Sequence, residues 1–350
     1  MLFDHTKINV SVDTTTYCNA RCPQCHRTNP DGLGKVDWLP LEQWSLEDFQ
    51  NAFSPEDMVN IDTFTLVGTW GEVVMVKDIM QIVRYVIDNS DCKISLDTNG
   101  SLRDEDWWWE FGLVGGERFQ VTFDIDGTNQ DMHSLYRQGT DLDKVLTNMS
   151  TFAATRGSTR SQTILFEHNA EYTEYIRQLC IDNGSTLHTF ITSDRFDHDN
   201  TMSFIDTNGN TQYLHRANNS VIPQGKISGL DTRYLSKDIT CTWAAKNKVF
   251  ITPDGAVLPC CFHSNGYYIY TKSGVSGDLV KSRHFQYYLN NRDRYNIFKR
   301  SLSDILQSDW FTDVLPGSMT SKDPIRVCER HCSSRADHAH QLREIRVVNL

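Results

Sequence analysis

A run of three cysteines near the start of this 350-residue chain constrains its fold more than any other feature. Cys18, Cys22 and Cys25 have a Cys-x3-Cys-x2-Cys spacing, which lets one loop supply three corners of an iron–sulfur cube. The fourth iron is then left without a ligand from the run, and an open position is typical of a reactive metal site. The thiolates could instead hold zinc together with His26, although adjacent residues such as Cys25 and His26 rarely point at the same metal.

Charge and composition disfavour several classes of protein. The net charge of −11 disfavours a broad electrostatic grip on nucleic acid or on an anionic membrane. No apolar run approaches the ~18 residues of a membrane span, and the first residues lack the pattern of a secretion signal. We therefore expect a protein of the reducing cytoplasm. Its ten cysteines are then more readily metal ligands than disulfide partners. Cys92 and Cys180 stand apart from the others, and we interpret both as small core residues.

Segments with the pattern of strands alternate with segments that have the pattern of helices. Helical patterns include the apolar stripe of residues 75–88 and a helix that Ser45 could cap together with Asp48. The alternation predicts an α/β fold with a parallel sheet and helices outside, and six units are fewer than the eight of a closed (β/α)8 barrel. The expected strands are residues 7–14, 63–67, 93–97, 119–125, 163–166 and 186–191.

Two motifs that directly follow expected strands carry candidate ligand-binding residues. Gly71 and Glu72 come after the second strand. Glycine there allows a ligand close to the backbone and a carboxylate can accept from an ammonium group, although a strand-ending turn explains the glycine equally well. Asp124 lies at the end of the fourth strand, where a carboxylate suits two hydroxyl donors. Arg137 follows, and its guanidinium either fits a carboxylate or is a solvated surface group.

A second group of cysteines lies in the last third of the chain. Cys241 precedes an expected strand, an Asp-Gly turn and a returning strand, and this hairpin would bring Cys260 back beside Cys241. Cys328 and Cys332 offer two more thiolates. Four cysteines in two pairs allow either zinc or an iron–sulfur cluster.

These motifs, in this order, resemble those of the radical S-adenosylmethionine (radical SAM) family. The resemblance implies a partial (β/α)6 TIM-like barrel whose site lies at the C-terminal ends of the strands. It also implies a [4Fe–4S] cluster bound by the three cysteines of the run, with SAM chelating the open iron. One electron from the cluster would then split SAM into methionine and a 5′-deoxyadenosyl radical, which takes a hydrogen atom from the substrate.

The resemblance also implies roles for the site residues. Gly71 and Glu72 correspond to a loosened form of the Gly-Gly-Glu motif, which binds the SAM amino group. Asp124 corresponds to the residue that faces the ribose hydroxyls, and Arg137 to an arginine that can meet the SAM carboxylate. The residue before the third cysteine is commonly aromatic and packs on the adenine. Here it is Gln24, so we expect adenine contacts to come partly from elsewhere.

The C-terminal third resembles the SPASM and twitch auxiliary domains of radical SAM enzymes. A full SPASM domain with two clusters needs more cysteines than remain, so a small α+β domain of the one-cluster twitch form is expected. Its ligands would be Cys241, Cys260, Cys328 and Cys332, with Cys261 as the alternative to Cys260. The expected parts of the chain are a core at residues 1–205, a linker or flap at 206–236 and the auxiliary domain at 237–350.

The first functional hypothesis is therefore a radical SAM oxidoreductase or maturase that acts on a peptide or protein side chain. The alternatives are a dehydrogenase or cyclase of a sugar-like or nucleotide small molecule, and a zinc-stabilised binding protein without catalysis. Because SAM reduction needs an electron of low potential, a flavodoxin or ferredoxin partner is expected. Five residues at the ends of the fifth and sixth strands could contact substrate or be solvated loop residues: Glu167, His168, Asn169, Asp194 and Arg195.

Overall fold

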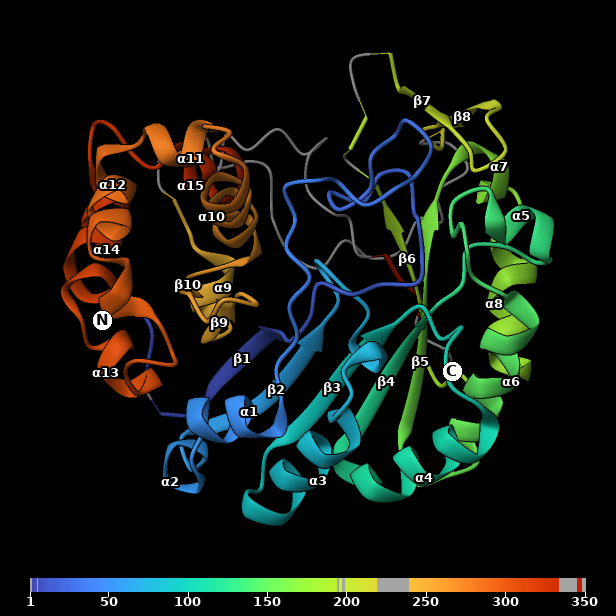
Figure 1. Cartoon of the computed structure of the whole chain (residues 1–350), viewed down its shortest axis with the longest axis horizontal. Coiled ribbons are helices and arrows are strands. Elements are labelled where there is room, and N and C mark those ends of the chain that lie inside the picture. Colours follow the sequence, from blue (N-terminus) through green and yellow to red (C-terminus); the bar gives the residue numbers. More distant parts are fainter. Residues whose placement is uncertain are drawn as a thin grey trace.

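Six parallel strands, neighbours in chain order, form the centre of the structure (Figure 1). This computed structural model describes residues 2–4, 6–193, 195–196, 199–218, 239–333 and the backbone of 345–347. Each of the six strands lies close to a segment that the sequence predicts. Their bounds are β1 (Ile8–Asp13), β2 (Ile61–Val67), β3 (Lys93–Thr98), β4 (Phe119–Asp124), β5 (Ser158–Leu165) and β6 (His188–Thr192).

Helices connect successive strands and lie outside the sheet, which confirms the partial (β/α)6 barrel expected from the alternating pattern (Figure 1). The turns η1 (Val73–Met75) and η2 (Gly116–Arg118) add single 3-10 turns. The helices are α1 (Leu46–Ala52), α2 (Pro55–Met58), α3 (Ile79–Asn89), α4 (Glu105–Gly115), α5 (Gln130–Ser134), α6 (Leu142–Ala153), α7 (Glu167–Ala170) and α8 (Thr173–Asp182).

Local sequence explains where these elements begin and which side they bury. Ser45 caps α1 in a reciprocal capping box with Asp48, as the sequence predicts. In β4, alternate side chains from Phe119 to Phe123 are fully buried against the outer helices. The remaining side chains of β4 therefore point to the other face, where Asp124 ends the strand. The polar inner face of the sheet is the face that carries the candidate site.

The C-terminal part extends the same sheet. β9 (Lys248–Ile251) pairs in parallel with β1, and β10 (Val257–Leu258) pairs antiparallel with β9 as the expected hairpin. The sheet order is therefore β10-β9-β1-β2-β3-β4-β5-β6-β11, where β11 (Ile345–Val347) is antiparallel to β6. The remaining C-terminal elements are α9 (Thr242–Ala245), α10 (Cys261–Ser273), α11 (Asp278–Lys281), α12 (Arg283–Asn290), η3 (Arg292–Tyr295), α13 (Leu302–Leu306), η4 (Trp310–Val314), α14 (Leu315–Thr320) and α15 (Arg326–Cys332).

One hydrophobic core joins the C-terminal helices to the sheet. The ring of Phe3, which precedes β1, packs edge-on against Phe311 with centroids 5.9 Å apart. The indole Nε1 of Trp44, which precedes α1, donates to the carbonyl oxygen of Pro253 in the β9–β10 turn at 2.7 Å. Residues 239–333 are therefore packed against the core rather than tethered to it.

A separate hairpin lies above the C-terminal ends of the strands (Figure 1). It consists of β7 (Thr201–Ile205) and β8 (Thr211–His215), so part of the expected linker or flap at residues 206–236 is a strand. Residues 219–236 of that segment lie outside the described residues. Within the described part of the chain, no helix has the length and apolar character needed to cross a membrane.

Candidate functional site

The loop that follows β1 gathers the three cysteines of the first run. The Cys25 amide donates to the Cys22 carbonyl oxygen at 3.0 Å, which closes a tight turn. The guanidinium of buried Arg27 donates to the carbonyl oxygens of Ala20 and Thr16, each at 3.3 Å, and so braces the loop from within. The shape of the loop that carries the thiols is therefore fixed by a backbone turn and by the Arg27 side chain.

The thiols are close enough to influence one another electrostatically. Burial raises the pKa of Cys22 to about 12, with the Arg137 guanidinium opposing the rise and Cys25 adding to it. Burial also raises the pKa of Cys18, and the Glu72 carboxylate contributes. Iron binds thiolates and displaces their protons, so three clustered thiols beside an arginine fit the ligand set of an iron–sulfur cluster.

Gly71 packs directly against the backbone that leads to the cysteines. A Cβ atom at this position would lie 2.3 Å from the Thr15 carbonyl oxygen and 2.8 Å from that of Tyr17. The amide of the next residue, Glu72, donates to the same Tyr17 oxygen at 2.6 Å. The glycine is therefore required for close approach of the turn after β2 to the cysteine loop.

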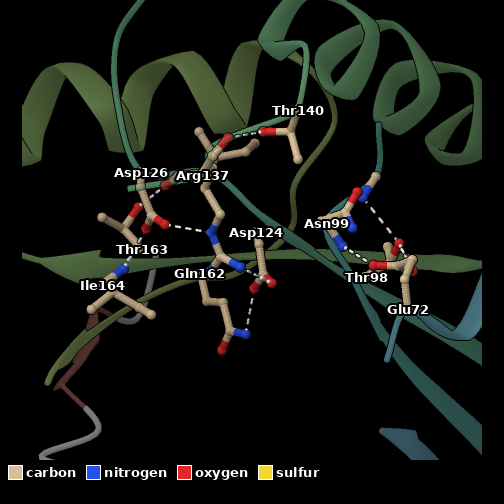
Figure 2. A network of polar contacts seen from close by, with 12 residues as sticks. Glu72, Thr98, Asn99, Asp124, Asp126, Arg137, Thr140, Gln162, Thr163 and Ile164 are labelled. Carbon is tan, nitrogen blue, oxygen red and sulfur yellow. Dashed lines mark hydrogen bonds and ion pairs between the residues drawn. The ribbon is translucent and has the colours of Figure 1, made fainter. Parts of the chain in front are cut away.

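The Glu72 carboxylate lies at the ends of β2 and β3 (Figure 2). Its Oε1 accepts from Thr98 Oγ1 at 2.7 Å, and its Oε2 accepts from the Asn99 amide at 2.8 Å. Burial raises the pKa of Glu72 to about 7, although the Asn99 hydrogen bond favours the ionised form. A buried carboxylate held this way can receive an ammonium group.

Asp124 and Arg137, both singled out from the sequence, form an ion pair (Figure 2). Arg137 Nη1 lies 2.9 Å from Asp124 Oδ2, and its Nε lies 2.6 Å from Oδ2 of Asp126. Burial raises the pKa of each carboxyl, and the guanidinium opposes both shifts. Arg137 is therefore a buried residue clamped between two carboxylates and not a solvated surface side chain.

Asp126 is a site residue that the motif analysis missed. Its side chain is fully buried, and its Oδ1 accepts from the Ile164 amide at 2.6 Å. The signal that could have found it is the Asp-x-Asp spacing, because residues two apart at a strand end point to the same side. On the other side of the ion pair, Asp124 Oδ1 accepts from Gln162 Nε2 at 2.6 Å.

Gln24 ties the cysteine loop to the segment after β6. Its Nε2 donates to the Arg195 carbonyl oxygen at 3.0 Å, and its Oε1 accepts from Ser193 Oγ at 2.7 Å. Arg195 returns a bond from its guanidinium to the Gln24 carbonyl oxygen at 2.8 Å. Asp194 lies outside the described residues, and Asn169 bonds to backbone oxygens of Asp126 and Ile164.

The second group of cysteines lines one cavity between the β9–β10 hairpin and the C-terminal helices. Cys261, the first residue of α10, is not among the lining residues. Burial raises the pKa of Cys260, and the neighbouring thiols of Cys261 and Cys328 raise it further. The lining combines Cys241, Cys260, Cys328, Cys332 and His263 with the apolar side chains of Trp243, Pro259, Phe262, Leu315, Met319 and Val327.

This donor set fits an iron–sulfur cluster that is closed by the protein. Four thiols in a largely apolar cavity match the four cysteine ligands of a [4Fe–4S] cluster. All ten cysteines of the chain are free thiols in this structure. Among the described residues, no group of three or more His, Cys, Asp or Glu side chains is arranged to hold a single metal ion.

Comparison with known proteins gives a family match for the C-terminal part and similar folds for most of the chain. Residues 241–333 match the SPASM family, described as an iron–sulfur cluster-binding domain. SuiB of Streptococcus suis shares the fold, with a TM-score of 0.57 and 13% identity over 90% of this chain and 68% of that chain. Its complex with the precursor peptide SuiA gives 0.55 and 14% over 90% and 67%.

Native anSMEcpe with bound AdoMet (S-adenosylmethionine) gives a TM-score of 0.54 and 16% identity over 96% of this chain and 93% of that chain. No curated protein sequence matches the chain significantly. The chain therefore has the fold of radical SAM enzymes, with a SPASM iron–sulfur cluster-binding domain at residues 241–333.

Proposed function

We propose that this protein is a radical SAM enzyme that uses SAM to abstract hydrogen from a peptide or protein side chain. The observation that carries the proposal is the convergence of the three thiols of one loop with a buried carboxylate, Glu72, and a buried guanidinium, Arg137. These groups lie at the C-terminal ends of parallel strands, where sites of barrels of this kind are built. Positive and negative groups beside a thiol cluster suit the charged methionine end of SAM.

Cys18, Cys22 and Cys25 would hold the first [4Fe–4S] cluster and leave one iron to SAM. When bound, the cluster supplies the electron that splits SAM into methionine and a 5′-deoxyadenosyl radical. The Arg137 charge next to Cys22 offsets the negative charge of ligated thiolates. The bonds from the Arg27 guanidinium to the carbonyl oxygens of Ala20 and Thr16 hold the loop in the shape that presents the three thiols.

The residues around the loop would orient SAM. Glu72 would accept the SAM ammonium group, and the close approach made by Gly71 brings this carboxylate to the cysteine loop. Asp124 would accept from the ribose hydroxyls, since its ion pair with Arg137 and its bond from Gln162 orient it and favour its ionised form against the effect of burial. Arg137 uses Nε and Nη1 for the two aspartates, and a guanidinium has further donors for the SAM carboxylate.

The second cavity would hold one auxiliary [4Fe–4S] cluster, which makes two clusters per chain. Cys241, Cys260, Cys328 and Cys332 would close all four of its irons, so the substrate could not bind to it through iron. Such a cluster passes electrons or shapes the substrate pocket. A flavodoxin or ferredoxin in a reducing cytoplasm would supply the low-potential electron for SAM cleavage.

A peptide or protein side chain is the proposed substrate class. SuiB has been crystallised with the precursor peptide SuiA, and anSMEcpe with AdoMet and a Cp18Cys peptide, at TM-scores of 0.55 and 0.51 to this chain. The inner face of the sheet presents partly exposed polar groups such as Asp97 and Gln162. These groups suit a polar target more than an apolar one.

The experiment that tests the proposal is production of 5′-deoxyadenosine by anaerobically purified protein supplied with SAM and dithionite. Wild-type protein should be brown, carry roughly eight irons per chain and form the product. The Cys22→Ala variant should lose about half of the iron and form no 5′-deoxyadenosine. The matched control is Cys92→Ala, since Cys92 is a buried core cysteine just before β3 whose thiol contacts the Ile61 carbonyl oxygen.

Normal product formation by Cys22→Ala would refute the proposal. A colourless wild-type protein that carries two zinc ions would instead favour the binding-protein alternative. The substrate class is tested with deuterium-labelled candidate substrates, because the radical takes a hydrogen atom from the substrate. Deuterium from a labelled peptide should appear in 5′-deoxyadenosine, and transfer only from labelled small molecules would assign the alternative class.

A further inference from the structure

His263 lies between two cysteines of the auxiliary cavity. Its imidazole is fully buried, with Nδ1 3.2 Å from Cys260 Sγ and Nε2 3.9 Å from Cys328 Sγ. These two sulfur atoms are the hydrogen-bond contacts of its ring nitrogens among the described residues. A buried imidazole normally bonds to oxygen, so a ring directed at two thiols calls for an explanation.

The local sequence fixes this ring in place. Cys260 is the N-cap of α10, and His263 is the third residue of that helix, so its side chain turns back toward the cap. The buried ring of Phe285 from α12 packs on the imidazole with centroids 5.8 Å apart. Apolar side chains from α14 and α15 complete the cavity, so water does not compete for the imidazole N–H.

We propose that His263 is a positioning residue that donates its Nδ1–H to Cys260 Sγ and thereby sets the reduction potential of the auxiliary cluster. The inference rests on the proposed function, because it requires that the cavity holds a cluster. A neutral imidazole carries one N–H, and the shorter of the two contacts assigns that proton to Nδ1. The longer Nε2 contact to Cys328 is then a packing contact.

The direction of the effect follows from charge. A hydrogen bond to a ligating sulfur stabilises the reduced cluster more than the oxidised one, because the reduced cluster carries one more negative charge. The bond therefore raises the potential of the auxiliary cluster. The four cysteines of the cavity already match the four irons, so the histidine acts through Cys260 rather than as a ligand.

A matched pair of variants isolates the hydrogen bond. Asparagine places an amide N–H near the position of Nδ1, whereas leucine has similar size and no donor. Both are made in full-length protein with Cys18→Ala, Cys22→Ala and Cys25→Ala, so that only the auxiliary cluster contributes to the spectra. The readout is the midpoint potential from a redox titration followed by electron paramagnetic resonance, with iron content measured on the same samples.

His263→Leu should keep about four irons and shift the midpoint potential to a more negative value. His263→Asn should have a midpoint potential close to that of the parent, because it keeps a donor. An unchanged midpoint in a fully loaded His263→Leu variant would overturn the proposal. Loss of one iron with the signal of a three-iron cluster in both variants would also overturn it, since this would make His263 a ligand. If the triple-alanine parent itself binds no iron, the auxiliary cluster fails and with it that part of the proposed function.

Discussion

Asp13 shows at the scale of one residue how the site is built around buried titratable groups. It ends β1 with no exposed surface, and its Oδ1 accepts from the Thr69 amide at 3.0 Å. Its Oδ2 has no hydrogen-bond partner among the described residues. Burial raises the pKa of Asp13 to about 8, although the hydrogen bond to Thr69 favours the ionised form. The residue therefore joins the first strand to the glycine turn as a neutral acid near pH 7.

Replacement of Asp13 by Asn should stabilise the protein increasingly as the pH rises. The folded-state pKa lies above the unfolded value, so the unfolded chain loses its proton first and wild-type stability falls between pH 3.8 and about 8. The variant carries no such proton, so its advantage should grow by up to about 1.4 kcal/mol per pH unit in that window. Urea unfolding at several pH values measures it.

The control is the same substitution at Asp62 on β2, because that aspartate is exposed whereas Asp13 is fully buried. A constant difference between Asp13→Asn and wild-type protein from about pH 5 to about pH 8 would contradict the assignment of a neutral Asp13. Such a result would mean that a partner holds the carboxylate ionised throughout.

Sequence reasoning at this scale singles out residues whose spacing along the chain is informative. The three cysteines of the first run are brought together by the loop, and the four cysteines of the second group by one cavity. It fails for Asp13, because its role arises only when the folded chain brings the distant Thr69 amide close. It also passes over Asp126 and His263, although the Asp-x-Asp spacing and the place of His263 three residues after Cys260 are local signals. The pairing of Asp124 with Arg137 is likewise a tertiary contact that no spacing rule specifies.

At the scale of elements, the turn after β2 and the loop after β1 behave as one unit. Their backbones meet there, with the Glu72 amide bonded to the Tyr17 carbonyl oxygen and Gly71 facing Thr15. The absence of a side chain at Gly71 is thus a condition for the position of Cys18. Its role is one of space, since its φ is not positive.

Gly71→Ala should displace the cysteine loop and reduce binding of the first cluster while sparing the auxiliary one. A Cβ 2.3 Å from a backbone oxygen forces the two loops apart, and overpacking of this kind costs about 1–3 kcal/mol. Iron content should fall toward about four per chain after anaerobic reconstitution. Gly34→Ala is the control, because nothing lies within 4 Å of a Cβ at that position. Equal iron loading of both variants would show that the loops separate without consequence.

The β9–β10 hairpin decides which of two adjacent cysteines faces the auxiliary cavity. Gly255 adopts a φ of +80° in the turn, and Thr252 bonds to Asp254 across it. Cys260→Ala should therefore remove the auxiliary iron, whereas Cys261→Ala should retain it. Iron analysis and electron paramagnetic resonance of the two variants measure this difference. The reverse pattern would make Cys261 the ligand.

The sequence predicts the positions of the strands better than it predicts which strands pair with each other. All six parallel strands lie near the expected positions, but β5 begins at Ser158 rather than near 163. Its buried positions include Thr159 and Ser161, which are polar, so the alternation that marks a half-buried strand is hidden. The parallel pairing of β9 with β1 joins segments too distant in sequence for any local pattern to reveal.

At the scale of the whole molecule, the C-terminal third completes the core. β9 covers the outer edge of β1, and the contact of Phe3 with Phe311 places the segment before β1 and the C-terminal helices in the same hydrophobic cluster. Tyr268 of α10 also packs on Trp70 beside the glycine turn, with centroids 5.1 Å apart. The two predicted domains therefore depend on each other for burial of apolar surface.

A fragment that ends at residue 236 should fail to unfold cooperatively. It would expose the edge of β1 and the apolar side chains that α10 and η4 cover, and surface of this kind promotes aggregation. In the full chain these surfaces are buried in the shared hydrophobic core, so the secondary structure of residues 1–236 should resist urea better there than in the fragment. Circular dichroism during urea titration compares the two. A fragment as stable as the full chain would show that residues 1–236 fold independently.

The position of β9 beside β1 has a consequence for biosynthesis. The strand that carries the cysteine loop leaves the ribosome well before its outer neighbour, because β9 follows all six strands of the barrel in chain order. Until residue 251 has been translated, β1 keeps an open hydrogen-bonding edge at which nascent chains can associate. The sheet therefore stays unfinished until β9 has been made, and the hydrophobic core that it shares with the C-terminal helices can form only afterwards.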